Sequence, residues 1–152
     1  MNAQQQQSRL DNARLEILRQ ELLAPVLSIE GHAELLNGQI KAEDFQEDLQ
    51  RIVTSAAKTR LLIDEMLAME ATALTDQDRE QQRQRFKHDL RNSVGAISGY
   101  SEIILEDLED SGDLDPENQT YLKHQLSDAQ KLLEMLEQCP RAADDGSLQH
   151  WK

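Results

Sequence analysis

The chain contains few of the residues that build disulfide-stapled or sheet-rich folds. Of its 152 residues, one is cysteine, three are proline, six are glycine and 3% are aromatic. Because Cys139 is the single thiol, no disulfide can form within the chain, and no group of cysteine and histidine residues has the spacing of a zinc site. This composition argues against a sandwich or barrel and favours helices held together by aliphatic side chains.

Long apolar runs and a basic leader are also missing. No run approaches the ~20 apolar residues that cross a bilayer, and segment 1–7 lacks the basic and apolar regions of a signal peptide. Together with the lone cysteine, this predicts a cytoplasmic protein. Positive charge is scarce as well, because 16 basic residues against 29 acidic ones give a net charge of −13. We therefore expect neither nucleic acid nor a membrane as a direct partner.

Apolar residues recur at helical spacing and predict an all-α protein. The predicted helices are 8–37, 42–69, 75–110 and 115–139. Pro25 lies inside the first and predicts a kink there. Residues 1–7 and 140–152 are read as flexible tails. The apolar stripe of each helix is here called its seam. The predicted seams are, in the first helix, Leu15, Leu18, Leu22, Val26, Ile29, Ala33, Leu36 and Ile40; in the second, Leu49, Ile52, Val53, Ala56, Ile63, Met66 and Leu67; in the third, Leu90, Val94, Ile97, Ser101, Ile104 and Leu108; and in the fourth, Leu122, Leu126, Ala129, Leu133 and Leu136.

His88 lies away from the seam of its helix. At ~100° per residue it points ~160° from Leu90, which predicts a solvent-exposed imidazole. The residues that share its face are Asn92, Gly95, Gly99, Glu102 and Glu106. The basic residues near it in the sequence are Arg79, Arg83, Arg85, Lys87 and Arg91. They fit either a solvated helix face with ion pairs between turns, or a local positive field for a phosphoryl group or an acidic partner site.

The stretch 86–102 resembles the phosphoacceptor box of the dimerisation and histidine-phosphotransfer domain (DHp, or HisKA-like) of sensor histidine kinases. The family pattern His-Glu/Asp-x-x-Asn/Thr reads here as His88-Asp89-Leu90-Arg91-Asn92, followed by Ala96-Ile97-Ser98-Gly99-Tyr100-Ser101-Glu102. The family usually has a proline just after the Asn/Thr position, where this chain has Ser93.

The resemblance implies a role for each residue of the box. His88 would be the phosphoacceptor, Asp89 would orient its imidazole or accept its proton, and Asn92 would position a water molecule in the reverse, phosphatase direction. The expected partner-binding residues are Lys87, Arg91, Gly95, Gly99 and Glu102. The implied partner is the receiver domain of a response regulator or a histidine kinase. Mg²⁺ is expected on the receiver, with no cofactor or metal on this chain.

The chain also contains an internal repeat. A shift of 68 residues places Leu22 on Leu90 and, away from the seam, Gly31 on Gly99. This looks like a second copy of the box that keeps the family proline as Pro25 and has Gln20 at the phosphoacceptor position. The second and fourth helices match less well, at a shift of about 73, a match that shared heptads can produce by chance.

Two hairpins in tandem are therefore expected, 8–70 without a phosphoacceptor and 76–139 with one, joined by 71–75. In the family, two chains each supply one hairpin. We expect this chain to imitate that dimer as an antiparallel, up-down-up-down four-helix bundle, a pseudo-dimer. The same seams also allow the hairpins to pair between two chains, as a homodimer.

No segment resembles the ATP-binding domain of a histidine kinase, and no glycine-rich phosphate loop is present. We therefore expect no autonomous kinase activity. Two alternatives stay open: the chain is a stand-alone phosphotransfer protein, or it is the N-terminal part of a longer protein. The first hypothesis is a histidine phosphotransfer module of a two-component phosphorelay, with exchange between His88 and a receiver aspartate. The alternative is a non-catalytic, histidine-kinase-like module that binds or sequesters a receiver or kinase, and a plain helical scaffold is a distant third.

Overall fold

Four α-helices make up most of the protein. The computed structural model describes residues 2–40, 43–72, 75–112 and 115–145. The helices are α1 (Ala3–Gln39), α2 (Glu43–Glu70), α3 (Asp76–Ser111) and α4 (Pro116–Asp145). The described residues contain no strand, so the predicted all-α class is confirmed. Within the same residues, no helix combines the length and the apolar character needed to cross a membrane.

Two helices extend beyond their expected ends. α1 begins at Ala3 rather than Ser8, because Asn2 caps it: the Asn2 side chain accepts a hydrogen bond from the Gln5 backbone N–H (2.8 Å), and the Gln5 side chain accepts one from the Asn2 N–H (3.1 Å). α4 continues to Asp145 instead of ending near Cys139. The rest of the expected C-terminal tail, 146–152, lies outside the described residues.

The remaining helix ends follow local sequence signals. The Thr75 hydroxyl caps the start of α3 by accepting a hydrogen bond from the Asp78 N–H (3.1 Å). Gly112 ends α3 with a φ of 75°, a left-handed conformation that glycine adopts without strain. Pro25 is buried inside α1, and the helix continues on both sides of it.

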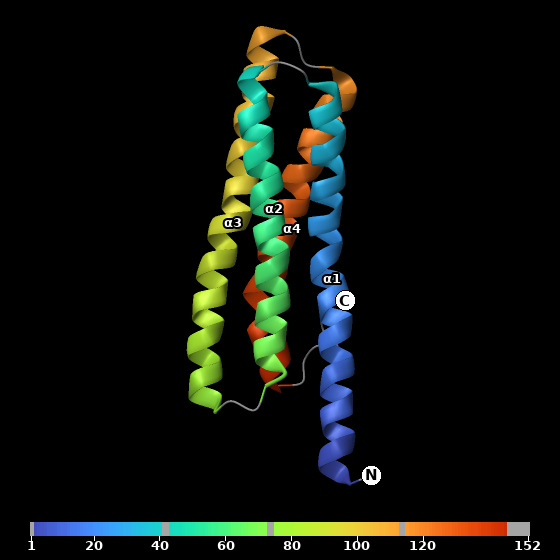
Figure 1. Ribbon diagram of the computed structural model, residues 1–152, viewed down its shortest axis with the longest axis vertical. Helices are drawn as coiled ribbons and strands as arrows, with labels where there is room; N and C mark the ends of the chain where they lie inside the picture. The colour runs from blue at the N-terminus through green and yellow to red at the C-terminus, as the bar shows by residue number, and fades with distance from the viewer. Residues whose placement is uncertain (1, 41–42, 73–74, 113–114, 146–152) are drawn as a thin grey trace.

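The helices form a ring in which α1 contacts α2 and α4, and α3 contacts the same two neighbours. Figure 1 shows the helices running side by side in an elongated four-helix bundle. Residues far apart in sequence, such as those of α1 and α4, therefore lie side by side along the length of the bundle.

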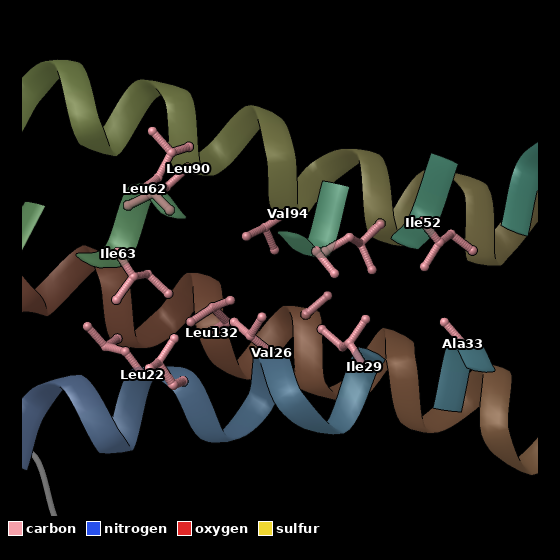
Figure 2. Close-up of a cluster of buried hydrophobic side chains, with 14 of the residues drawn as sticks. Leu22, Val26, Ile29, Ala33, Ile52, Leu62, Ile63, Leu90, Val94 and Leu132 are labelled. Carbon is pink, nitrogen blue, oxygen red and sulfur yellow. The ribbon is translucent and has the colours of Figure 1, made fainter. Parts of the chain in front are cut away.

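Aliphatic side chains from all four helices fill the centre of the ring (Figure 2). Every predicted seam residue of α3 is buried, and so are those of α1 except the partly buried Leu15. The expected seam of α4 needs a correction, because the predicted Leu126 and Leu133 are only partly buried, whereas Leu132 is fully buried. The buried Gln125 belongs to the same stripe, and its polarity concealed the regular three-four spacing that leads to Leu132.

Burial follows the internal repeat. Many residues 68 positions apart in α1 and α3 are buried together, as are many residues 73 positions apart in α2 and α4. Leu23 and Arg91 are an exception, because Leu23 is buried and Arg91 is exposed. The buried pairs include Leu22 and Leu90, Val26 and Val94, Ile29 and Ile97, Leu36 and Ile104, Leu49 and Leu122, Ala56 and Ala129, and Ile63 and Leu136. The agreement extends to pairs of unlike chemistry, since Thr59 and Leu132 are both fully buried.

Candidate functional site

The predicted phosphoacceptor stands on the outer surface of α3. The His88 side chain is 74% exposed, on the side of the helix opposite the buried Leu90. Its Nδ1 atom lies 3.3 Å from Oδ1 of the neighbouring Asp89, whose side chain is also exposed. If Nδ1 carries the proton and donates it to this carboxylate, the lone pair of Nε2 is free for an incoming reactant.

The face of α3 beyond His88 is open to a partner. Asn92, Gly95 and Glu102 are exposed and Gly99 is half-buried. Apart from adjacent residues and the backbone of its own helix turn, a Cβ atom added to Gly95 or to Gly99 would have no neighbour within 4 Å. The fold therefore has no steric need for glycine at either position, although glycine in a helix costs up to ~1 kcal/mol relative to alanine. The expectation that a partner helix approaches here remains a prediction, and the open backbone is compatible with it.

The two cations that flank His88 are held by one carboxylate on α4. Arg91 donates from Nε and Nη2 to Oε1 of Glu137, over 2.9 and 2.6 Å. The Lys87 Nζ atom lies 3.6 Å from Oε2 of the same residue. The hydrogen bond from Arg91 is the main reason why the pKa of Glu137 is lowered from its usual value; partial burial opposes the shift and the charge of Lys87 adds to it.

The other basic residues of this region are not equivalent. Arg83 is buried, with 2% of its side chain exposed, and it donates to both carboxylate oxygens of Glu70 at the end of α2. The Arg79 Nε atom is 4.0 Å from the same carboxylate. Arg83 therefore serves the junction of α2 and α3, and the interpretation of all five basic residues as one field around His88 is wrong for this side chain.

Ser93 occupies the place of the family proline and connects α3 to α2. Its hydroxyl lies 2.8 Å from the hydroxyl of Thr59, and both side chains are buried. Each hydroxyl also has a carbonyl acceptor in its own helix, that of Ser55 for Thr59 (2.8 Å) and that of Leu90 for Ser93 (3.2 Å). One hydroxyl can therefore donate to the other while its partner donates to a carbonyl. α3 runs unbroken from Asp76 to Ser111, so the predicted site sits on a continuous helix backed by a buried polar contact.

The corresponding face of α1 has a similar frame but different chemistry. Gln20 is exposed at the position equivalent to His88. Beside it, Arg19 donates to Asp64 of α2 over 2.7 Å, just as Lys87 faces Glu137 in the second hairpin. Three exposed apolar side chains lie along this part of α1: Ile17 (57%), Leu27 (54%) and Leu35 (47%).

Sequence reasoning did not identify Glu137 as part of this region. A signal was present, because the shifts that align the hairpins place Arg19 on Lys87 and Asp64 on Glu137.

Over the described residues, no group of three or more His, Cys, Asp or Glu side chains is placed to hold a metal ion. Comparison of the chain with known protein families, curated proteins and solved structures finds no match.

Proposed function

We propose that this protein is a histidine phosphotransfer module that exchanges a phosphoryl group between His88 and an aspartate of a receiver domain. The observation that carries the proposal is the outward His88 imidazole beside Asp89. Asn92 and two glycines that the fold does not require share its face. Such an arrangement suits a transfer in which the partner supplies the remaining chemistry.

The proposed step needs little from this chain. Nε2 of His88 attacks the phosphorus of a receiver phosphoaspartate, the N–P bond forms as the P–O bond breaks, and the aspartate leaves as a carboxylate. The proton stays on Nδ1, where Asp89 stabilises the positive imidazole ring at 3.3 Å. Mg²⁺ bound by the receiver would neutralise the phosphoryl oxygens. In the reverse direction the same atoms return the group, and Asn92 would position a water molecule for hydrolysis.

We further propose that the chain is a pseudo-dimer of two antiparallel hairpins, in up-down-up-down order. Equivalent contacts in the two halves support this. Arg19 and Asp64 correspond to Lys87 and Glu137 within the hairpins. Between hairpins, Arg51 lies 5.4 Å above the ring of Tyr100, and the equivalent His124 and His32 rings are 5.2 Å apart. Light scattering after gel filtration should give a mass of 17.4 kDa, and twice that mass would favour the homodimer.

The decisive experiment is phosphoryl transfer from phosphorylated receiver domains. Wild-type protein should acquire acid-labile, base-stable phosphate, and His88→Gln should acquire none. His124→Gln is the matched control, because His124 is an exposed histidine on α4 outside the proposed site. Label on His88→Gln, or no label on the wild type from any receiver or histidine kinase tested, would refute the relay.

A second candidate function is favoured by the apolar residues exposed on α1. Ile17, Leu27 and Leu35 lie on the face that corresponds to the His88 face of α3. This suits a module that binds a receiver or kinase without accepting phosphate. In that case Leu27→Ser with Leu35→Ser would abolish receiver binding in calorimetry, whereas His88→Gln would leave it unchanged. The opposite pattern would place the binding surface on the His88 face of α3 and would refute this second candidate.

A further inference from the structure

One carboxylate on α4, that of Glu137, contacts both cations beside His88. Lys87 directly precedes His88, and Arg91 follows it at the i+3 position, where side chains on a helix are neighbours. Both are drawn to Glu137: Arg91 by two hydrogen bonds of 2.9 and 2.6 Å, and Lys87 at 3.6 Å. Arg91 and Glu137 are each about half exposed, so neither side chain is locked in place by packing.

From this geometry we infer that Glu137 is a positioning residue that holds Lys87 and Arg91 until a phosphoryl group arrives on His88 and then yields them to it. The inference rests on the proposed function of His88. A phosphoryl group carries close to two negative charges and three acceptor oxygens, whereas Glu137 offers one charge and two oxygens. Exposed ion pairs are weak, so the exchange of partners is energetically easy.

Two consequences follow for the chemistry at His88. While Glu137 holds the cations, they give little help to an incoming anionic donor. Once the phosphoryl group is on Nε2, the same cations offset its charge and slow its loss to water. Removing the Glu137 charge should therefore accelerate phosphorylation and lengthen the life of phosphohistidine, and both effects should depend on Lys87 and Arg91.

The test uses the full chain and phosphoramidate as the donor, so that no receiver is involved. Nε2 attacks phosphorus, the P–N bond of phosphoramidate breaks, and ammonia leaves. Glu137→Gln should be phosphorylated about two- to fivefold faster than the wild type, in the range expected for an exposed charge pair. Asp64→Asn is the matched control, because it removes the equivalent carboxylate from the hairpin that has Gln20 instead of a histidine. Its rate should equal that of the wild type.

A second set of measurements separates action through the cations from a simple change in net charge. In a Lys87→Gln/Arg91→Gln background, adding Glu137→Gln should no longer change the rate or the lifetime. The NMR signal of the Arg91 Nε–H group should also shift when wild-type His88 is phosphorylated. An effect of Glu137→Gln that persists in that background, or that Asp64→Asn reproduces, would overturn the inference.

The remaining outcomes are distinguishable. If the wild type is labelled on His88 but Glu137→Gln behaves identically, the role of Glu137 is refuted and the phosphotransfer function stands. If neither phosphoramidate nor any receiver labels His88, the proposed function fails and this inference fails with it. Circular dichroism of each variant confirms that a changed rate does not come from unfolding.

Discussion

Replacement of Arg83 tests whether the junction of α2 and α3 depends on a buried ion pair. Arg83 and Glu70 have 2% and 6% of their side chains exposed. The guanidinium donates from Nε to Oε1 and from Nη2 to Oε2, the second bond being 2.7 Å long. Arg79, with Nε 4.0 Å from Glu70, is a weaker second partner of the carboxylate. Both side chains are almost completely removed from water, so the effect of breaking this pair should be large.

Arg83→Met keeps most of the buried stem but leaves the Glu70 carboxylate without its main partner. Breaking a buried pair from one side typically costs ~3–5 kcal/mol. For a chain of this size, that corresponds to a fall in melting temperature on the order of 10 °C. Replacing both residues, as Arg83→Met/Glu70→Leu, should recover most of the loss, because no uncompensated charge is then buried.

Urea unfolding followed by circular dichroism at neutral pH measures these differences. Arg14→Met is the control, because the Arg14–Asp11 pair is exposed and 3.7 Å long; its loss should cost less than ~1 kcal/mol. If Arg83→Met costs no more than this control, the reasoning is wrong. A double variant that is less stable than either single variant would also refute it, because the two changes should compensate.

Three further changes test the packing and charge described above. Gly99→Ala should stabilise the protein by up to ~1 kcal/mol in urea unfolding, because the new methyl group meets nothing within 4 Å and alanine favours a helix; a loss of stability would show an internal contact at this site. Ser101→Ala should cost ~1–3 kcal/mol by leaving Oε1 of the buried Gln125 without its 2.9 Å hydrogen bond, and adding Gln125→Ile should restore stability; a double variant no better than the single one would argue against this account. Glu137 has a lowered pKa in the folded state, so its ionised carboxylate stabilises the protein and Glu137→Gln should lose that stabilisation, at most ~1 kcal/mol. The stability difference between the wild type and Glu137→Gln should be present above about pH 4.5 and absent once the pH falls below the folded-state pKa. A stability difference that stays constant across an acid titration would contradict this.

Much of the bundle was predictable because aliphatic residues reveal a helix seam directly. Leu90 and Val94 fix the buried side of α3, and the angle from Leu90 to His88 then predicts the exposure that the imidazole has. Polar members of a seam are harder to recognise. Arg83 lies one heptad before Leu90, yet its charge suggested a surface position, and only the proximity of Glu70 makes its burial possible.

The partners of the candidate site could not be predicted in the same way. The pairing of Glu137 with Lys87 and Arg91 depends on how α3 and α4 are rotated against each other, which the periodicity of neither helix determines. The start of α1 was missed for a different reason. A polar run rich in glutamine suggested a tail, whereas Asn2 and Gln5 satisfy each other's backbone donors and allow the helix to begin early.

Because one chain provides all four helices, the two halves of the bundle can differ in sequence, and this determines how many phosphoacceptor histidines each bundle has. In a bundle made from two identical chains, each position occurs twice, and a substitution alters both copies together. Here Gln20 and His88 occupy corresponding positions but are encoded separately, as are Leu27 and Gly95. Each bundle therefore presents one histidine of this kind. Under the proposed function it carries one phosphoryl group or none, and its opposite face is free to diverge toward another task.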